Sequence, residues 1–206
     1  MNLPRLILAD DVGNPKVVPA SILLIQAMKS CGMRLNLFMS SRREEDLRLL
    51  EVLSGEPVCC VDAWTAGNAK NLKALFQRRG TSDAINVLSV PLGQGIEERI
   101  FQVYPEPLEL AKTLQCDILP LIQASTSAAV STNRALSVLS SLSESGKETV
   151  RGLLFSSVKN PREFQLLEQE YNRRCPTLSL GYIPQNVERD MPAMPELSPR
   201  NMSMKL

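Results

Sequence analysis

The most informative segment for the fold lies near the start of the chain, over residues 5–16. It reads Arg5-Leu6-Ile7-Leu8-Ala9-Asp10-Asp11-Val12-Gly13-Asn14-Pro15-Lys16. Its first part, residues 5–9, is an apolar run that predicts a buried strand, and a helical pattern over residues 17–31 follows the polar loop. A strand that is apolar throughout is typical of a parallel sheet with helices packed on both of its faces.

The rest of the chain repeats this alternation of apolar runs and amphipathic stretches. Strands are expected at 5–9, 33–39, 84–90, 117–123, 150–155 and 178–183, and helices at 17–31, 44–53, 68–79, 108–114, 128–142 and 162–174. The pattern predicts a three-layer α/β fold with a doubly wound, mostly parallel sheet. Ligands of such folds bind at the carboxyl ends of the strands, where the strand order reverses. We therefore expect a site among residues 10–16, 40–45 and 91–95.

Length and composition favour one domain followed by a tail. A chain of 206 residues buries enough surface to fold without a disulfide or metal staple. We predict an α/β domain over residues 1–184 and an irregular segment rich in proline and methionine over residues 185–206. The segment contains Pro192, Pro195, Pro199, Met191, Met194, Met202 and Met204 without the periodicity of a helix or strand. We expect it to pack along the domain or to cover a partner.

The balance of charged residues excludes several classes of partner. The 23 Lys and Arg residues against 22 Asp and Glu leave a net charge of +1, which is not the basic surface of a nucleic-acid or anionic-membrane binder. The chain has no run of 18 apolar residues, and its first residues lack the pattern of a signal peptide. We therefore expect a cytoplasmic protein with no nucleic-acid and no membrane partner.

The chain contains no histidine and five cysteines. The absence of histidine excludes chemistry that depends on an imidazole base or an imidazole metal ligand. Adjacent Cys59 and Cys60 could form a redox or metal pair, but the five cysteines have no metal-ligand spacing. We interpret them as small buried apolar residues of a reduced protein, and we predict no metal site.

Several segments carry a resemblance to a known family. They are Val61-Asp62-Ala63-Trp64, Leu110-Ala111-Lys112-Thr113-Leu114, Gln123-Ala124-Ser125, Gly152–Val158, Gly181-Tyr182-Ile183-Pro184 and Leu197–Asn201. The chain resembles, over nearly its whole length, the amino-terminal ATP-binding domain of cobyrinic acid a,c-diamide synthases, which is related to dethiobiotin synthetase and the MinD/ParA group. This resemblance implies a P-loop NTPase-like fold of the dethiobiotin synthetase type. It also implies ATP and Mg²⁺ as the family's cofactors, and a homodimer paired through the nucleotide face.

The loop after the first strand departs from the motif that the family needs for its activity. That motif is G-x-x-x-x-G-K-[ST], whose glycines expose amides to the phosphates, whose lysine reaches the terminal phosphates and whose hydroxyl holds Mg²⁺. The remnant of this loop consists of Asp10, Asp11, Gly13, Asn14 and Lys16. Pro15 removes an amide donor, and valines follow the lysine. The two aspartates add negative charge where the triphosphate would sit.

The other positions of the family's site have also changed. After the second strand only Asp46 corresponds to an acidic residue of the family, and the carboxylate of the third strand falls within residues 87–89, where there is no acid. The aspartate that ends the next strand is replaced by Gln123, and the asparagine that holds the base by Ser156. We also expect no glutaminase domain, which releases ammonia in the family. We therefore predict no cofactor, and expect a non-catalytic descendant.

The candidate ligand crevice comprises Arg42, Arg43, Asp46, Trp64, Gln123 and Ser156. The acids at residues 10 and 11 could hold a cation, but we expect nearby lysine and arginine side chains to neutralise them. The arginines at 42 and 43 could bind an anion, yet the acids that follow them favour a solvated helix start. We expect Trp64 to be a packing anchor. A receiver-like acidic pair is disfavoured because no aspartate ends the strand at 84–90.

These observations leave three hypotheses. We favour a catalytically inactive interaction or regulatory module, present as a homodimer, with a protein partner at the tail or the crevice face. The first alternative is an ATP-dependent amidoligase subunit with an atypical phosphate loop, which would be an enzyme. The second is a small-molecule binding protein that uses the crevice at the strand ends. The amidoligase requires backbone amides aimed at phosphate despite Pro15 and the paired acids, so the loop distinguishes the first two.

Overall fold

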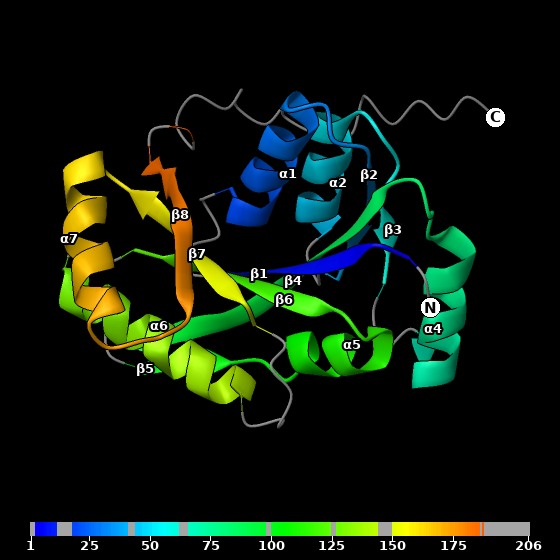
Figure 1. The fold of residues 1–206 in the computed structure, drawn as a ribbon. Coiled ribbons are helices and arrows are strands. Elements are labelled where there is room, and N and C mark those ends of the chain that lie inside the picture. The colour runs from blue at the N-terminus through cyan, green and yellow to red at the C-terminus, as the bar shows by residue number, and fades with distance from the viewer. Residues whose placement is uncertain are drawn as a thin grey trace.

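The computed structural model describes residues 3–11, 18–40, 44–61, 66–97, 100–124, 127–143, 150–185 and 187. In this part of the chain a single sheet runs through the molecule in the order β3-β2-β4-β1-β6-β7-β8, with every neighbouring pair parallel (Figure 1). The strands are β1 (Arg5–Asp11), β2 (Leu35–Met39), β3 (Cys59–Cys60), β4 (Ile85–Glu97), β6 (Asp117–Gln123), β7 (Gly152–Val158) and β8 (Leu178–Pro184). One further strand, β5 (Ile100–Val103), pairs antiparallel with the end of β4.

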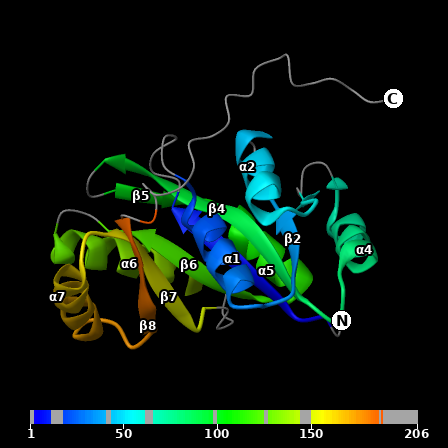
Figure 2. The ribbon, with the colours of Figure 1, turned by 90° about the horizontal axis from the view of Figure 1, so that it is seen from above.

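Helices cover the two faces of the sheet unequally (Figures 1 and 2). They are α1 (Ala20–Ser30), α2 (Glu44–Ser54), α4 (Ala69–Arg79), α5 (Glu106–Leu114), α6 (Ala128–Ser143) and α7 (Pro161–Asn172). Helices α1 and α2 supply one hydrophobic core, and α4, α5, α6 and α7 supply the other. The predicted three-layer α/β fold with a doubly wound, mostly parallel sheet is confirmed. No helix within these ranges has the length and apolar character needed to cross a membrane.

The apolar run of β1 explains why the sheet needs a helical layer on each side. Ile7, Leu8 and Ala9 are fully buried. Ile7 and Ala9 belong to the core under α4–α7, whereas Leu8 belongs to the core under α1 and α2. Successive side chains of a strand point to opposite faces, so this one strand contributes to both cores.

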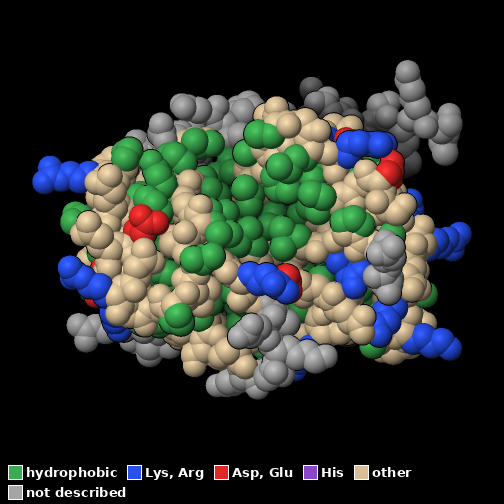
Figure 3. All heavy atoms as spheres, viewed as in Figure 1, with side chains coloured by type: hydrophobic (Ala, Val, Ile, Leu, Met, Phe, Trp, Pro, Cys, Tyr) green, Lys and Arg blue, Asp and Glu red, His purple; other side chains and the backbone are tan. Residues whose placement is uncertain are grey.

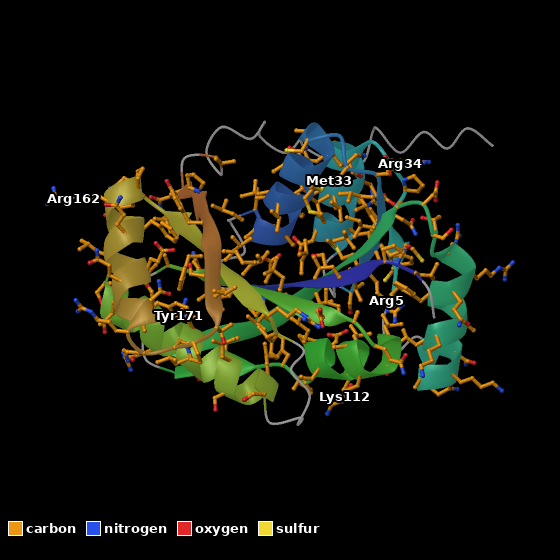
Figure 4. The ribbon with its side chains drawn as sticks, viewed as in Figure 1. Arg5, Met33, Arg34, Lys112, Arg162 and Tyr171 are labelled. Carbon is orange, nitrogen blue, oxygen red and sulfur yellow. The ribbon has the colours of Figure 1, made fainter. Side chains whose placement is uncertain are left out.

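Helix starts follow the capping residues of the sequence. The side chains of Asn68 and Asn160 accept hydrogen bonds from the amides of Asn71 and Glu163, and so cap α4 and α7. At the other end of α7, Tyr171 is fully buried (Figure 4). Its ring packs edge-on against the ring of Phe155, with 5.6 Å between the ring centroids. Both helices lie within two residues of the bounds predicted from their apolar spacing.

Among the predicted boundaries that differ from the structure, those of α1, β4 and β1 each have a physical reason. Helix α1 begins at Ala20 rather than at residue 17, because a proline at 19 restricts the residue before it to extended backbone. Strand β4 does not end at Val90 but continues to Glu97, because β5 pairs with its extension. Residues 91–95 are therefore strand rather than loop, and Asp10 and Asp11 belong to β1 rather than to the loop after it.

Candidate functional site

The strand order reverses at β1, which lies between β4 and β6. From β1 the chain runs outward to β2 and β3, returns through β4, and then crosses to β6 on the other side of β1. Asp10 near the carboxyl end of β1 is aligned with Pro91 of β4 and Leu121 of β6. This is the place where doubly wound folds bind their ligands, so Asp10 marks the centre of the candidate site.

The carboxylate of Asp10 is bound to the start of α1. Its side chain is 5% exposed, and its Oδ1 and Oδ2 accept hydrogen bonds from the backbone amide of Ser21 at 3.0 and 2.9 Å. The amides of the next two residues, Ile22 and Leu23, donate to the carbonyl of Pro19 at 3.0 and 3.4 Å. Three successive amides in the first turn of α1 therefore have acceptors inside the chain. A carboxylate at this helix end is favoured by the partial positive charge there.

The hydroxyl of Ser21 reaches the neighbouring strand. Its Oγ lies 2.7 Å from Oγ of Ser89 in β4, and both side chains are buried. In a phosphate loop the hydroxyl at the start of the helix holds Mg²⁺, and the lysine and a glycine precede it. Counted back from Ser21, Ala20 stands at the lysine position and Pro19 at the glycine position. Because α1 starts at Ala20, the first hydroxyl of this helix is that of Ser21, five residues after Lys16.

A second polar contact joins β2 to α5 at the same end of the sheet. The hydroxyl of Ser40, which follows β2, donates to the carboxylate of Glu106 in the first turn of α5. The amide of Ser40 donates to the carbonyl of Ser89 at 2.8 Å. Ser21, Ser89, Ser40 and Glu106 thus form a polar row from α1 across β4 and β2 to α5. Sequence reasoning missed this row, whose signal is a serine within or just after an apolar strand.

The predicted crevice residues are only partly brought together. Gln123 ends β6 and is aligned with Ser156 of β7, whose side chain is 5% exposed. The carbonyl of Ser156 accepts from the amide of Ala124, and the carbonyl of Gln123 accepts from Arg134 at 3.5 Å. Asp46 lies in α2. The remaining predicted residues, Gly13, Asn14, Lys16, Arg42, Arg43 and Trp64, lie outside the described residues, as does the side chain of Asp11.

The residues that the structure describes at the switch point do not fit a Mg²⁺-nucleotide. Ala20 provides no cation for phosphate, and Asp10 places a carboxylate against the amide of the helix start. The two hydroxyls of Ser21 and Ser89 are bonded to each other, and no acidic residue stands at the Ser89 position. A magnesium site of a phosphate loop combines a hydroxyl with carboxylates and phosphate oxygens. We therefore derive no phosphate-transfer step at this site.

The cysteines differ in burial more than the sequence predicts. Cys116 is buried, but Cys31 and Cys60 are exposed, so the interpretation of all five as buried residues was wrong. Burial raises the pKa of the Cys116 thiol from 9.0 to about 12, while Arg5 lowers it and Asp117 raises it. Burial also raises the pKa of Cys59, against a smaller lowering by Arg79. Neither thiol is a thiolate at neutral pH, so neither is an activated nucleophile.

A hollow lies at the end of the sheet opposite to the switch point. It measures about 520 Å³ and is lined in part by Arg5, Gln115 and Asp117. The guanidinium of Arg5 (Figure 4) donates to the carbonyls of Leu3 and Gln115. The guanidinium of Arg5 is thus bonded within the chain. Because the hollow lies at the amino ends of the strands, the hollow is separate from the switch point.

Solved structures with the same fold are found at low sequence identity. FlhF, solved with GMPPNP and Mg²⁺, superposes with a TM-score of 0.52 at 13% identity, over 92% of this chain and 69% of that one. The signal recognition particle receptor FtsY from Elizabethkingia anophelis, solved with GDP, superposes with a TM-score of 0.56 at 8% identity. The match covers 90% of this chain and 59% of that one. This chain is therefore shorter than either. No protein-family model and no curated protein matches the sequence. The likeness shows a P-loop NTPase-like fold.

Proposed function

We propose that this chain is a catalytically inactive relative of the ATP-binding domain of cobyrinic acid a,c-diamide synthases, and that it acts as an interaction or regulatory module. The observation that carries the proposal is the contact between Asp10 and Ser21, which places a carboxylate of the chain at the start of α1. In phosphate-binding folds this helix end receives the phosphate of the ligand. Here the chain supplies its own anion.

The electrostatic repulsion between the Asp10 carboxylate and a phosphate is large enough to favour exclusion of nucleotide. At an effective dielectric constant of about 20, a carboxylate about 4 Å from a phosphate charge costs about 4 kcal/mol. Where no cation offsets it, a cost of that size weakens binding about a thousandfold. Position 20, where a phosphate loop has the lysine that neutralises the terminal phosphates, is an alanine.

The interaction role rests on the scaffold that remains. The carboxyl-end rim of the sheet is rigidly built, because the polar row from Ser21 to Glu106 links two helices to two strands. We propose that this rim binds protein, and that a second copy of the chain pairs through it as the resemblance implies. A sedimentation experiment checks the pairing: we expect a dimer at micromolar concentration, and a monomer across a wide concentration range would contradict it.

Calorimetric titration with Mg-ATP and with Mg-GTP tests the inactive assignment. We expect no saturable heat at millimolar nucleotide for the wild-type chain. The variant Asp10→Asn tests the role of the charge, because it removes the charge but keeps the shape of the side chain. The control is Asp117→Asn, which makes the same change at the amino end of β6. Saturable binding by the wild type with micromolar affinity would overturn the proposal and favour the amidoligase alternative. Binding of a different small molecule in place of nucleotide would favour the second alternative.

A further inference from the structure

Half of one sheet face has no helix over it in the described part of the chain. Helices α1 and α2 pack over β1, β2 and β4, and the four other helices lie on the opposite face. Over β6, β7 and β8 the α1 side presents leucines, namely Leu119, Leu154, Leu178 and Leu180, which we call the β6–β8 apolar face. Figure 3 shows apolar side chains gathered at the centre of this view of the molecule. Parallel sheets are normally covered on both faces, but the described part of the chain supplies no helix over this half.

The geometry of β8 directs its leucines to this open side. Leu178 and Leu180 are 64% and 57% exposed. A Cβ built on Gly152 of β7 would lie 2.8 Å from the side chain of Leu180, which places Leu180 on the face of β7 away from α7. Leu178 lies two residues earlier, and side chains two apart in a strand share a face.

A bulge next to these leucines keeps the two sides of β8 distinct. Gly181 has a φ of +140°, and the pairing of β7 with β8 shifts register at this point. After the bulge Tyr182 stacks on Phe164 of α7 at 4.6 Å, and Ile183 joins the core under α1. The extra residue therefore lets β8 expose its leucines on one side and still anchor α7 on the other.

The segment that follows β8 matches this face in length and pattern. Although residues 188–206 lack the period of a helix or strand, Met191, Met194 and Leu197 are spaced by three residues, with prolines between them. A polyproline II helix has three residues per turn and rises about 3.1 Å per residue, so these side chains would share one face over about 19 Å. Strand β8 has seven residues, and at about 3.3 Å each it spans about 23 Å.

We propose that residues 188–206 of this chain fold back over the β6–β8 apolar face, with Met191, Met194 and Leu197 against its leucines. The segment starts at the carboxyl end of the strand that carries the face, next to Val187, which is itself 41% exposed. Because the two surfaces belong to one chain, contact between them is intramolecular and does not depend on protein concentration. Methionine side chains adapt to an irregular apolar surface of this kind.

Limited trypsin digestion of the full chain tests the proposal, because Arg189 and Arg200 lie in the segment. In the wild type we expect slow cleavage at both sites, and in Leu180→Asp cleavage about tenfold faster or more. The matched control is Leu166→Asp on α7, since Leu166 is also 57% exposed but lies away from this face. We expect no change in cleavage of the control.

A variant within the segment separates this result from unfolding of the domain. Met194→Asp leaves β8 unchanged, and we expect it to speed cleavage at Arg189 and Arg200 as much as Leu180→Asp does. Equal cleavage rates in the wild type and in both variants would overturn the proposal. A wild-type dimer that Leu180→Asp converts to monomer, with no change in cleavage rate, would also overturn it and assign the face to a second copy.

Discussion

The backbone amide of Ser21 donates to both carboxylate oxygens of Asp10, at 3.0 and 2.9 Å, and this joins the first turn of α1 to the end of β1. The contact spans the loop in which a P-loop protein would hold phosphate. An internal carboxylate at this position stabilises the helix start and at the same time opposes an external anion. Chemical denaturation measures the first effect, and nucleotide binding measures the second.

The stability effect is tested by Asp10→Ala. Removing a buried carboxylate that accepts from a helix amide is expected to lower the free energy of unfolding by about 1.5–3 kcal/mol. The control is Asp117→Ala, whose carboxylate is partly exposed and bonds at 2.9 Å to the exposed side chain of Arg151. An exposed pair is worth about 1 kcal/mol or less. Urea denaturation distinguishes the two, and equal losses in both variants would contradict the role assigned to Asp10.

The hydroxyl pair of Ser21 and Ser89 predicts a coupling. Ser21→Ala or Ser89→Ala alone leaves one buried hydroxyl without this partner, at a cost of about 1–3 kcal/mol. The double variant removes both hydroxyls, so its loss should be smaller than the sum of the two single losses. A double-mutant cycle by chemical denaturation measures this difference. Strictly additive losses would show that the two hydroxyls do not act on each other.

Cys116 predicts a dependence of stability on alkaline pH. Its thiol has a folded pKa of about 12 against an ordinary value of 9.0. Between these values the unfolded chain loses this proton and the folded chain keeps it, so unfolding is favoured as the pH rises. The contribution is about 1.4 kcal/mol per pH unit above about pH 9 and ends near pH 12. Below pH 9 this group has no effect.

The measurement compares the wild type with Cys116→Ala from pH 8 to alkaline pH. The variant should lose stability less steeply than the wild type above about pH 9, because it lacks the ionising thiol. Thiol labelling gives an independent check: Cys31 is exposed and should react in the folded chain at pH 8, whereas Cys116 should react only on unfolding. Rapid labelling of Cys116 in the folded chain would contradict its burial.

The sequence was sufficient for the fold because its signals are local. The strand over 117–123 was predicted at its observed bounds, since an uninterrupted apolar run has one interpretation between two helices. Helices α4 and α7 were predicted from the spacing of their apolar residues, within two residues of their observed bounds. The strands that the sequence did not predict are short or depend on pairing with another strand. Strand β3 has two residues, and β5 exists through its pairing with the extension of β4.

The site was less predictable, because its contacts join residues far apart in the chain. Ser40 meets Glu106 across 66 positions, and Ser21 meets Ser89 across 68. Neither spacing has a sequence pattern. The charge of Asp10 was recognised, but its acceptor role was not, because the start of α1 was placed three residues too early. The expectation that lysine or arginine neutralises this acid stays a prediction.

We propose that the carboxylate of Asp10 holds the start of α1 and leaves no place for polyphosphate. A crystal of the wild-type chain grown or soaked with Mg-GTP or Mg-ATP is the decisive experiment. We expect Asp10 to remain bonded to the amide of Ser21, with no polyphosphate density at this helix end. Polyphosphate and metal seated at the start of α1, with the Asp10 carboxylate displaced, would contradict it.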